Sequence, residues 1–225
     1  MEVWSCAFQI YIYIYWIVFQ VAGHDLTRHL IRLVTRQQNI SPDDVSTTTV
    51  KMFKEIKEEY TYVALDFEHE ILKKEHKSKS FRLPDGFSFN LGTECFRCRE
   101  ILFRPSFADI GSPGIHECCD LAIKQSGADN HWNFYTNILL AGGTTMCQGF
   151  DDRLEREMSV LGPPTSSPNV VAPHDRENSV WLGGSILTSL STFQSQWVTR
   201  KEYEEYGSSI VQRKFRWRYE IHIFW

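Results

Sequence analysis

Two glycine pairs, Gly142–Gly143 and Gly183–Gly184, each follow a short apolar run in the second half of the chain. A glycine pair after a buried strand exposes backbone N–H groups and lets a flat or anionic ligand approach closely, which suits a nucleotide site. Thr144 and Met146 follow the first pair directly. The pattern is neither a Walker loop nor GxGxxG, so these residues alone indicate nucleotide binding only weakly.

Cysteine and histidine residues also occur at spacings that could bind a metal ion. Cys95 and Cys98 have CxxC spacing, and His116, Glu117, Cys118 and Cys119 are consecutive. No second CxxC or CxxH follows to complete a tetrahedral zinc set, and six cysteines with two adjacent do not form a disulfide framework. We therefore expect reduced thiols and neither a metal site nor a redox pair.

Each glycine pair is expected to join a strand to a helix. Residues 138–140 and 180–182 are apolar runs typical of buried strands, and Asp151 and Asp152 favour the start of the helix after the first pair. The expected apolar faces are Phe150, Leu154, Met158 and Leu161 on the first helix, and Ile186, Leu187, Leu190, Phe193 and Trp197 on the second.

The first half of the chain predicts two helices and a hairpin. Asp25 is expected as the N-cap of a helix through Gln37. A second helix from about Thr49 to Glu59 leads into a predicted strand, TYVALDF, and LPDGFSFNLG predicts a hairpin with Asp-Gly at its turn. NISPDDVSTTT is typical of a loop, and the charged segment KKEHKSKS is expected to lie in solvent.

Several ordered blocks resemble the actin family from about Ala22 to about Phe215. They are AGHDLTRHL, KEIKEEYTYVALDFEHE, LPDG, FRCREILFRPSF, GIHE, NILLAGGTTMCQG, SVWLGGSILTSLSTFQSQW and SSIVQRKF. The two glycine-rich, aspartate-bearing phosphate loops with which intact actins begin have no counterpart. The resemblance implies an α/β fold, an incomplete actin-like (ribonuclease H-like) ATPase fold that lacks its amino-terminal half. It also implies that the block around Cys95 and Cys98 is a strand and that GIHE is a turn and helix start.

The resemblance implies a nucleotide site on two segments. The glycine turn at Gly142 and Gly143 would lie against the adenosine of ATP, and one helix would reach the adenine and ribose. Glu177 stands where actins carry a lysine beside the adenine, and Cys147 stands where a tyrosine is usual. The implied nucleotide-binding residues are Gly142, Gly143, Thr144, Met146, Lys57, Glu58 and Lys54, with no catalytic and no metal-binding residue. Without the resemblance, the sequence would predict that the charged side chains of Lys54, Lys57 and Glu58 lie on a solvent-exposed helix face.

By resemblance, the intact family binds ATP with Mg²⁺ and assembles filaments in the cytoplasmic cytoskeleton. We expect an actin-like protein that is truncated and impaired, without ATP hydrolysis, and whose partners are itself, actin or actin-binding proteins. A non-enzymatic module that binds actin or its partners is the alternative. A formal charge of −4 and scattered basic residues exclude a typical nucleic-acid binder.

The amino-terminal run leaves a further alternative open. Residues 3–23 carry no charged side chain. About 20 apolar residues can span a bilayer, so this segment is long enough for a membrane-anchored variant. The Met-Glu start lacks the basic residues of a signal peptide, and the alternating Ile-Tyr run suits a strand. The expected parts are 1–21, apolar extension; 22–110, small cleft-flanking domain; 111–178, part of the large domain; 179–215, carboxy-terminal actin segment; and 216–225, divergent tail.

Overall fold

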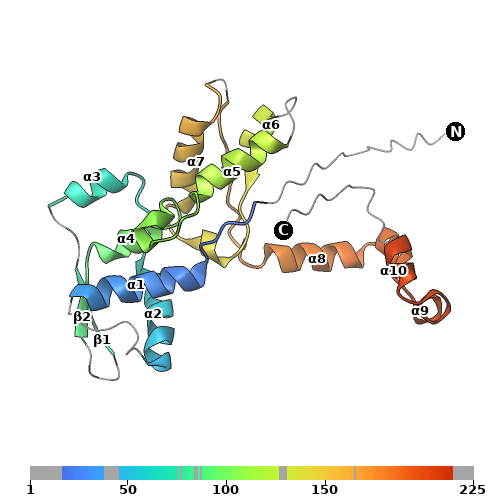
Figure 1. The fold of residues 1–225 in the computed structure, drawn as a ribbon, viewed down its shortest axis with the longest axis horizontal. Helices are drawn as coiled ribbons and strands as arrows, with labels where there is room; N and C mark the ends of the chain where they lie inside the picture. Colours follow the sequence, from blue (N-terminus) through green and yellow to red (C-terminus); the bar gives the residue numbers. More distant parts are fainter. Residues whose placement is uncertain are drawn as a thin grey trace. The chain divides into compact units, whose positions relative to one another are not determined.

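The computed structural model describes residues 17–37, 46–74, 76, 78–83, 86, 88–126, 131–164 and 166–214 (Figure 1). The chain forms two compact units, residues 1–177 and 178–225. The expectations for residues 1–16, for the tail 216–225, for most of the loop at 39–49 and for Asp85 at the hairpin turn lie outside the described residues. No helix of the described part is long and apolar enough to cross a membrane.

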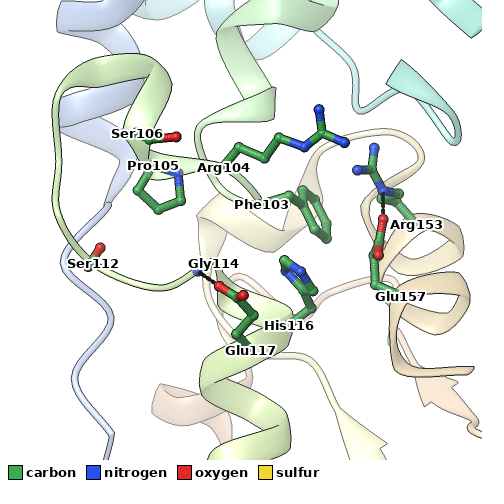
Figure 2. A pocket seen from close by; sticks show the side chains of 10 residues that line it. All are labelled: Phe103, Arg104, Pro105, Ser106, Ser112, Gly114, His116, Glu117, Arg153 and Glu157. Atoms are coloured by element: carbon green, nitrogen blue, oxygen red, sulfur yellow. Dashed lines mark hydrogen bonds and ion pairs between the residues drawn. The ribbon is translucent and has the colours of Figure 1, made fainter. Parts of the chain in front are cut away.

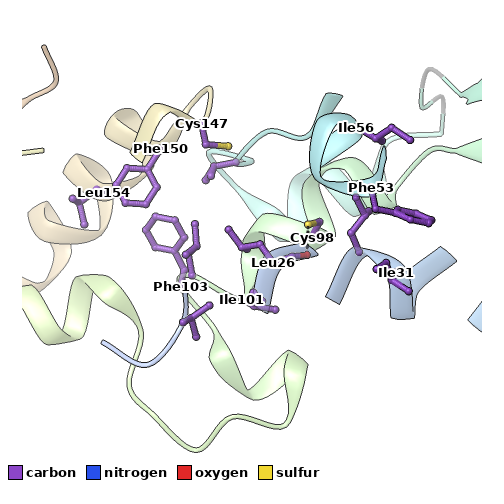
Figure 3. Packing of buried hydrophobic residues seen from close by; sticks show 14 of the residues in the cluster. Leu26, Ile31, Phe53, Ile56, Cys98, Ile101, Phe103, Cys147, Phe150 and Leu154 are labelled. Carbon is purple, nitrogen blue, oxygen red and sulfur yellow. Dashed lines mark hydrogen bonds between the residues drawn. The ribbon is translucent and has the colours of Figure 1, made fainter. Parts of the chain in front are cut away.

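Three helices form the core of one end of the first unit: α1 (Gly23–Gln37), α2 (Thr47–Tyr60) and α4 (Glu94–Glu100). Leu26, Leu30 and Val34 recur at helical spacing on α1 and are fully buried. They pack with Phe53 of α2, among other residues of one continuous hydrophobic cluster (Figure 3). The apolar stripes of α1 and α2 therefore fix the position of α2 against α1.

The helix starts differ in detail from the prediction. Asp25 is not the N-cap of α1, which begins at Gly23; its carboxylate instead accepts a hydrogen bond from the Ala22 N–H at 3.0 Å. Ser46 caps α2, because its hydroxyl accepts from the Thr49 N–H. Both acceptors satisfy N–H groups that a helix start leaves without an intrahelical partner.

Two predicted strands are wrong. Residues 61–66 run in no strand, and Phe67 opens a short helix, α3 (Phe67–Leu72), which Asp66 caps through the His69 N–H. Cys95 and Cys98 lie on helix α4 and not on the strand that the family resemblance implied. The predicted hairpin is present as β1 (Lys79–Arg82) and β2 (Ser88–Leu91), paired antiparallel.

The other end of the first unit is a small parallel sheet with helices. The strands β3 (Ile138–Leu139) and β4 (Val170–Val171) pair in parallel, and α7 (Phe150–Leu161) packs against β4 and α5. Phe150, Leu154 and Met158 are buried on α7, as predicted. Strand β3 is shorter than the predicted strand at residues 138–140. It is also less buried than predicted, since the Leu139 side chain is exposed. The remaining elements here are η2 (Pro105–Ala108), α5 (Ile115–Gln125), α6 (His131–Tyr135) and η4 (Gly143–Met146).

The second unit contains α8 (Ser179–Ser189), η5 (Ser191–Gln196), α9 (Arg200–Tyr206) and α10 (Ser209–Lys214). The predicted strand and glycine turn at residues 180–184 are wrong, because both belong to α8. The apolar side chains of α8 are exposed, including Trp181, Ile186 and Leu187. A helix that is apolar on all sides is normally enclosed by other protein.

Candidate functional site

Lys57 is the sequence-predicted site residue with the most defined surroundings. Its side chain is buried on α2, with 5 % of the residue surface exposed. The Nζ atom donates to the carbonyl oxygen of Gly23 at 2.9 Å and lies 3.1 Å from Thr27 Oγ1. Burial lowers the pKa of Lys57, and the nearby Arg99 guanidinium lowers it further. The amine therefore holds the start of α1 against α2.

The glycine turn forms as predicted at Gly142. This residue has a φ of 91°, which L side chains rarely adopt, and its N–H donates to the carbonyl oxygen of Arg176 at 2.8 Å. Its own carbonyl accepts from the Thr145 hydroxyl at 2.7 Å. No atom lies within 4 Å of the Cβ position of Gly142 or Gly143, so open space adjoins the turn.

The structure brings Lys57 and Thr144 to one place, beside Gly23. A Cβ atom on Gly23 would lie 3.6 Å from Lys57 Nζ and 3.5 Å from Thr144 Oγ1. Gly23 was not predicted as a site residue, although it lies in the block AGHDLTRHL that resembles the family. The sequence signal was the glycine at the start of the first helix.

Hydrogen bonds and close packing between residues 61–63 and 147–149 connect the end of α2 to the segment that follows the glycine turn. The Val63 N–H donates to the Gln148 carbonyl at 2.9 Å. Gly149 has a φ of 76°, and a Cβ atom there would meet the Val63 carbonyl oxygen at 2.6 Å, so only glycine fits without a shift. Arg99 donates from Nε to Thr61 Oγ1 at 2.7 Å and thereby anchors the end of α2.

Arg176 supports the turn and was missed by the sequence reasoning. Its guanidinium donates from Nη2 to the Thr145 carbonyl at 2.8 Å and from Nη1 to the Pro173 carbonyl at 2.9 Å. The adjacent Glu177, where the family carries a lysine, is exposed. Its position next to Glu177, where the family carries a lysine, was the available sequence signal.

The other predicted site residues lie on the surface. Lys54 and Glu58 occupy exposed positions of α2, one helical turn apart, and Met146 ends η4 with an exposed side chain. The structure therefore does not bring these three residues together with Lys57 and Thr144 at Gly23. Their exposure agrees with the solvated helix face that the sequence alone would predict.

A polar pocket of about 340 Å³ lies elsewhere in the first unit, between η2, the start of α5 and α7 (Figure 2). Arg153 on its wall donates to the Glu157 carboxylate at 2.6 Å, and Glu117 accepts from the Gly114 N–H at 2.6 Å. The His116 ring lies 5.7 Å from the Phe103 ring, and burial lowers the pKa of His116. Glu117 thus completes a structural helix start, as expected for GIHE.

The cysteine surroundings favour inert thiols. Cys98 is buried, its Sγ lies 3.3 Å from the Leu26 carbonyl oxygen, and burial raises the pKa of this thiol to about 12. Burial likewise raises the pKa of Cys95 and of Cys119 to about 11. Thiols with raised pKa values are poor nucleophiles and poor metal ligands.

The described residues do not fit a magnesium site. Among them, no group of three or more His, Cys, Asp or Glu side chains could hold a metal ion. Mg²⁺ prefers carboxylate, phosphate and water oxygens in octahedral geometry. No step that depends on a metal is therefore assigned to these residues.

Comparisons with known proteins bear out the resemblance of the sequence blocks. The family model described as Actin matches residues 17–216. Over 202 residues the chain is 35 % identical to a protein named "Putative actin-29" from Dictyostelium discoideum, with 87 % of this chain and 52 % of that protein covered. The chain thus spans about half the length of this curated relative. A match over most of its residues shows that the chain belongs to the actin family.

Proposed function

We propose that the protein is an actin-like cytoskeletal protein that associates with actin filaments, with itself or with actin-binding proteins. Membership of the actin family supports this function. The cytoplasmic cytoskeleton is the location that goes with it. The fold that we propose for it is the incomplete actin-like, ribonuclease H-like fold implied by the sequence blocks.

The observation that carries a nucleotide-linked version of this function is the meeting of Lys57 and Thr144 at Gly23. Lys57 comes from α2 and Thr144 from the glycine turn, the two segments that the resemblance implies for adenosine. Open space adjoins Gly142 and Gly143. Adenosine would bind there between the turn and α2.

Nucleotide binding by these residues is proposed to be weak. The Lys57 amine already donates to Gly23 and would have to share that bond with a ligand. Glu177 adds a carboxylate at a position that is a lysine in the family. The described residues also offer no cluster for Mg²⁺, which normally offsets the charge of a triphosphate.

A second candidate function is a non-enzymatic interaction module, which the second unit favours. Trp181, Ile186 and Leu187 are large apolar side chains exposed on α8. Exposed apolar surface of this kind marks protein interaction sites. In this version the protein docks on actin or on an actin-binding protein without responding to nucleotide.

Co-sedimentation with actin filaments separates the two functions. For the first, the amount of this protein in the pellet should change when ATP is added, and Gly143→Val should remove that change by filling the open space. For the second, Trp181→Ser should lower the pelleted amount equally with and without ATP. Absence of the protein from the pellet in all conditions, together with failure to pellet by itself, would contradict both.

A further inference from the structure

The outer side of helix α1 carries a row of basic side chains. Four of them recur at four-residue intervals and are all exposed: His24, Arg28, Arg32 and Arg36. Neighbouring members are about 6 Å apart along the helix axis, because each residue advances the helix by about 1.5 Å. The acidic residue of α1, Asp25, lies in the first turn, and its carboxylate accepts a hydrogen bond from the Ala22 N–H. Beyond that turn, the charged residues of α1 are therefore all basic.

The arginines of this row have no acidic partner. Arg28 donates from Nη2 to His24 Nε2 at 3.0 Å. Within the part of the chain that the structure describes, no carboxylate forms an ion pair with Arg28, Arg32 or Arg36. Arg156, which is also exposed, is by contrast held in an ion pair at 2.8 Å. Because like charges one helical turn apart oppose helix formation, the row does not serve the stability of α1 itself.

Arg97 of α4 adds an exposed cation close to this row. Helices α1 and α4 pack against each other. The pKa of the buried His29 ring on α1 is lowered to about 4, first by burial and then by cations of both helices, Arg32, Arg97 and Arg36. The exposed carboxylate of Asp109 opposes this effect. The cations of α1 and α4 therefore gather around one point of the first unit.

The residue types of the row favour an anionic partner with paired oxygens. Arginine presents parallel N–H groups that fit a carboxylate or a phosphate, and α1 contains arginine but no lysine. The chain as a whole has a formal charge of −4, and Asp109 adds a carboxylate near the row. A broad array of phosphates, as on a membrane or on duplex DNA, would also meet this negative charge. The row therefore fits a narrow acidic element of another protein better.

An acidic α-helix has the spacing that this row requires. Carboxylates at positions i, i+4 and i+8 of a helix are also about 6 Å apart along its axis. If such a helix lies along α1, each carboxylate faces one of the three arginines. Each of these pairs forms charge-assisted hydrogen bonds, which are stronger than those between neutral groups.

We propose that Arg28, Arg32 and Arg36, together with Arg97, bind an acidic helix of a partner protein. The glutamate or aspartate side chains of that helix, four residues apart, pair with the three arginines of α1. This surface includes neither the candidate nucleotide-binding residues nor α8. The interaction is therefore independent of both functions proposed above.

Peptide titration of the full chain tests the spacing of this pairing. The probe is a stapled, alanine-rich helical peptide with three glutamates at four-residue intervals. The control peptide has the same composition, but its glutamates are five residues apart and so lie on three sides of the helix. NMR titration of the Arg32 amide at low salt should show the probe binding about fivefold to tenfold more tightly, because only the probe pairs with three arginines at once. Equal affinities of the two peptides would overturn the proposal.

Two variants of the chain locate the binding surface. The triple variant Arg28→Gln, Arg32→Gln, Arg36→Gln should weaken binding of the probe about tenfold. The matched variant removes three exposed cations elsewhere in the first unit, Lys51→Gln, Lys74→Gln and Arg82→Gln, and should weaken binding about twofold or less. All six side chains are exposed, so both variants should fold, which circular dichroism checks. Equal weakening by the two variants would show that only net charge matters and would contradict the proposal.

Phosphate-bearing probes decide the class of partner. Vesicles that contain phosphatidylserine and a duplex DNA oligonucleotide are titrated at the same low salt concentration as the peptide. The proposal expects the full chain to bind both more weakly than the glutamate peptide. Tighter binding of either probe, lost in the triple arginine variant, would assign the row to phosphates and overturn the proposal.

Discussion

The amine of Lys57 donates a hydrogen bond to the backbone carbonyl of Gly23 at 2.9 Å, across 34 residues of sequence. This bond joins the last part of α2 to the first residue of α1. Thr144 reaches the same glycine from the turn after β3. A single point in the first unit thus connects the two helices with the candidate nucleotide turn.

Lys57→Met should show how much the buried stem of this lysine contributes to the free energy of unfolding. Methionine keeps most of the buried volume, and the Gly23 carbonyl retains its bond from the Thr27 hydroxyl at 3.0 Å. Lys57→Ala leaves a cavity and should cost about 2 kcal/mol more in free energy of unfolding than Lys57→Met. Urea denaturation of both variants measures the difference, and equal stability would mean that the side chain stem does not fill the site.

The helices could be predicted from sequence where a long apolar stripe was decisive. The α1 stripe at Leu26, Leu30 and Val34 and the α7 stripe at Phe150 and Leu154 are buried as their spacing predicts. Such stripes are local, so periodicity alone identifies them.

The sequence-based predictions are wrong or incomplete where contacts between residues distant in sequence determine the structure. Val180, Trp181 and Leu182 have strand-like side chains but continue into a helix through two glycines. Leu139 lies in an apolar run typical of a buried strand, yet its side chain is exposed. The bond from Lys57 to Gly23 joins residues that no local pattern connects. The family resemblance implied Lys57 as a site residue, whereas local sequence predicted a solvated position for it and did not predict its partner.

The free energy of unfolding should decrease as the pH falls below about 6.5, because of His29. This ring is buried near Arg32, Arg36 and Arg97, and burial followed by these cations lowers its pKa from 6.5 to about 4, against a small opposing effect of Asp109. The folded state therefore resists protonation, whereas the unfolded chain takes up a proton below pH 6.5. Stability is full above that pH and decreases as the pH falls toward 4, by roughly 2–3 kcal/mol at pH 4.5.

The variant His29→Gln provides the control for this pH effect. The decrease in free energy of unfolding between pH 7.5 and pH 4.5 should be smaller in His29→Gln than in the parent chain by about the same 2–3 kcal/mol. Urea titrations at the two pH values measure it. Parallel decreases in both proteins would assign the pH dependence to other groups.

Removing Arg153 should be strongly destabilising. Only 4 % of its side chain is exposed, and its guanidinium bonds to the buried Glu100 carboxylate at 3.2 Å and to the Ala64 carbonyl at 2.8 Å. Burial raises the pKa of Glu100, and Arg153 opposes that rise. Arg153→Met leaves this carboxylate with Arg104 at 3.5 Å, so it should cost about 3 kcal/mol.

Two further variants test the cause of this loss. Adding Glu100→Leu to Arg153→Met should recover much of the stability, because the uncompensated buried charge disappears. Arg156→Met, which breaks an exposed pair with Asp66, should cost about 1 kcal/mol or less. If the double variant were no more stable than Arg153→Met, packing rather than charge would explain the loss.

The exposed face of α8 should limit solubility. Leu187→Gln together with Leu190→Gln replaces two half-exposed apolar side chains, and soluble yield after centrifugation should increase. Thr188→Gln, on the same stretch of the second unit, changes a polar position and should leave the yield unaltered. An equal yield from all three proteins would show that this face is already covered in solution.

The last prediction concerns adenosine, for which the glycine turn and the charge at position 177 act in opposite directions. If adenosine binds beside Gly142 and Lys57, its Kd should be near 1 mM, or about 4 kcal/mol of affinity. Glu177→Lys should tighten binding about threefold to tenfold by replacing a carboxylate with the cation usual in the family, since exposed charges contribute up to about 1 kcal/mol. NMR titration of the Thr144 amide measures both proteins. Identical titrations for the parent chain and Glu177→Lys would show that this carboxylate does not lie beside the bound nucleoside.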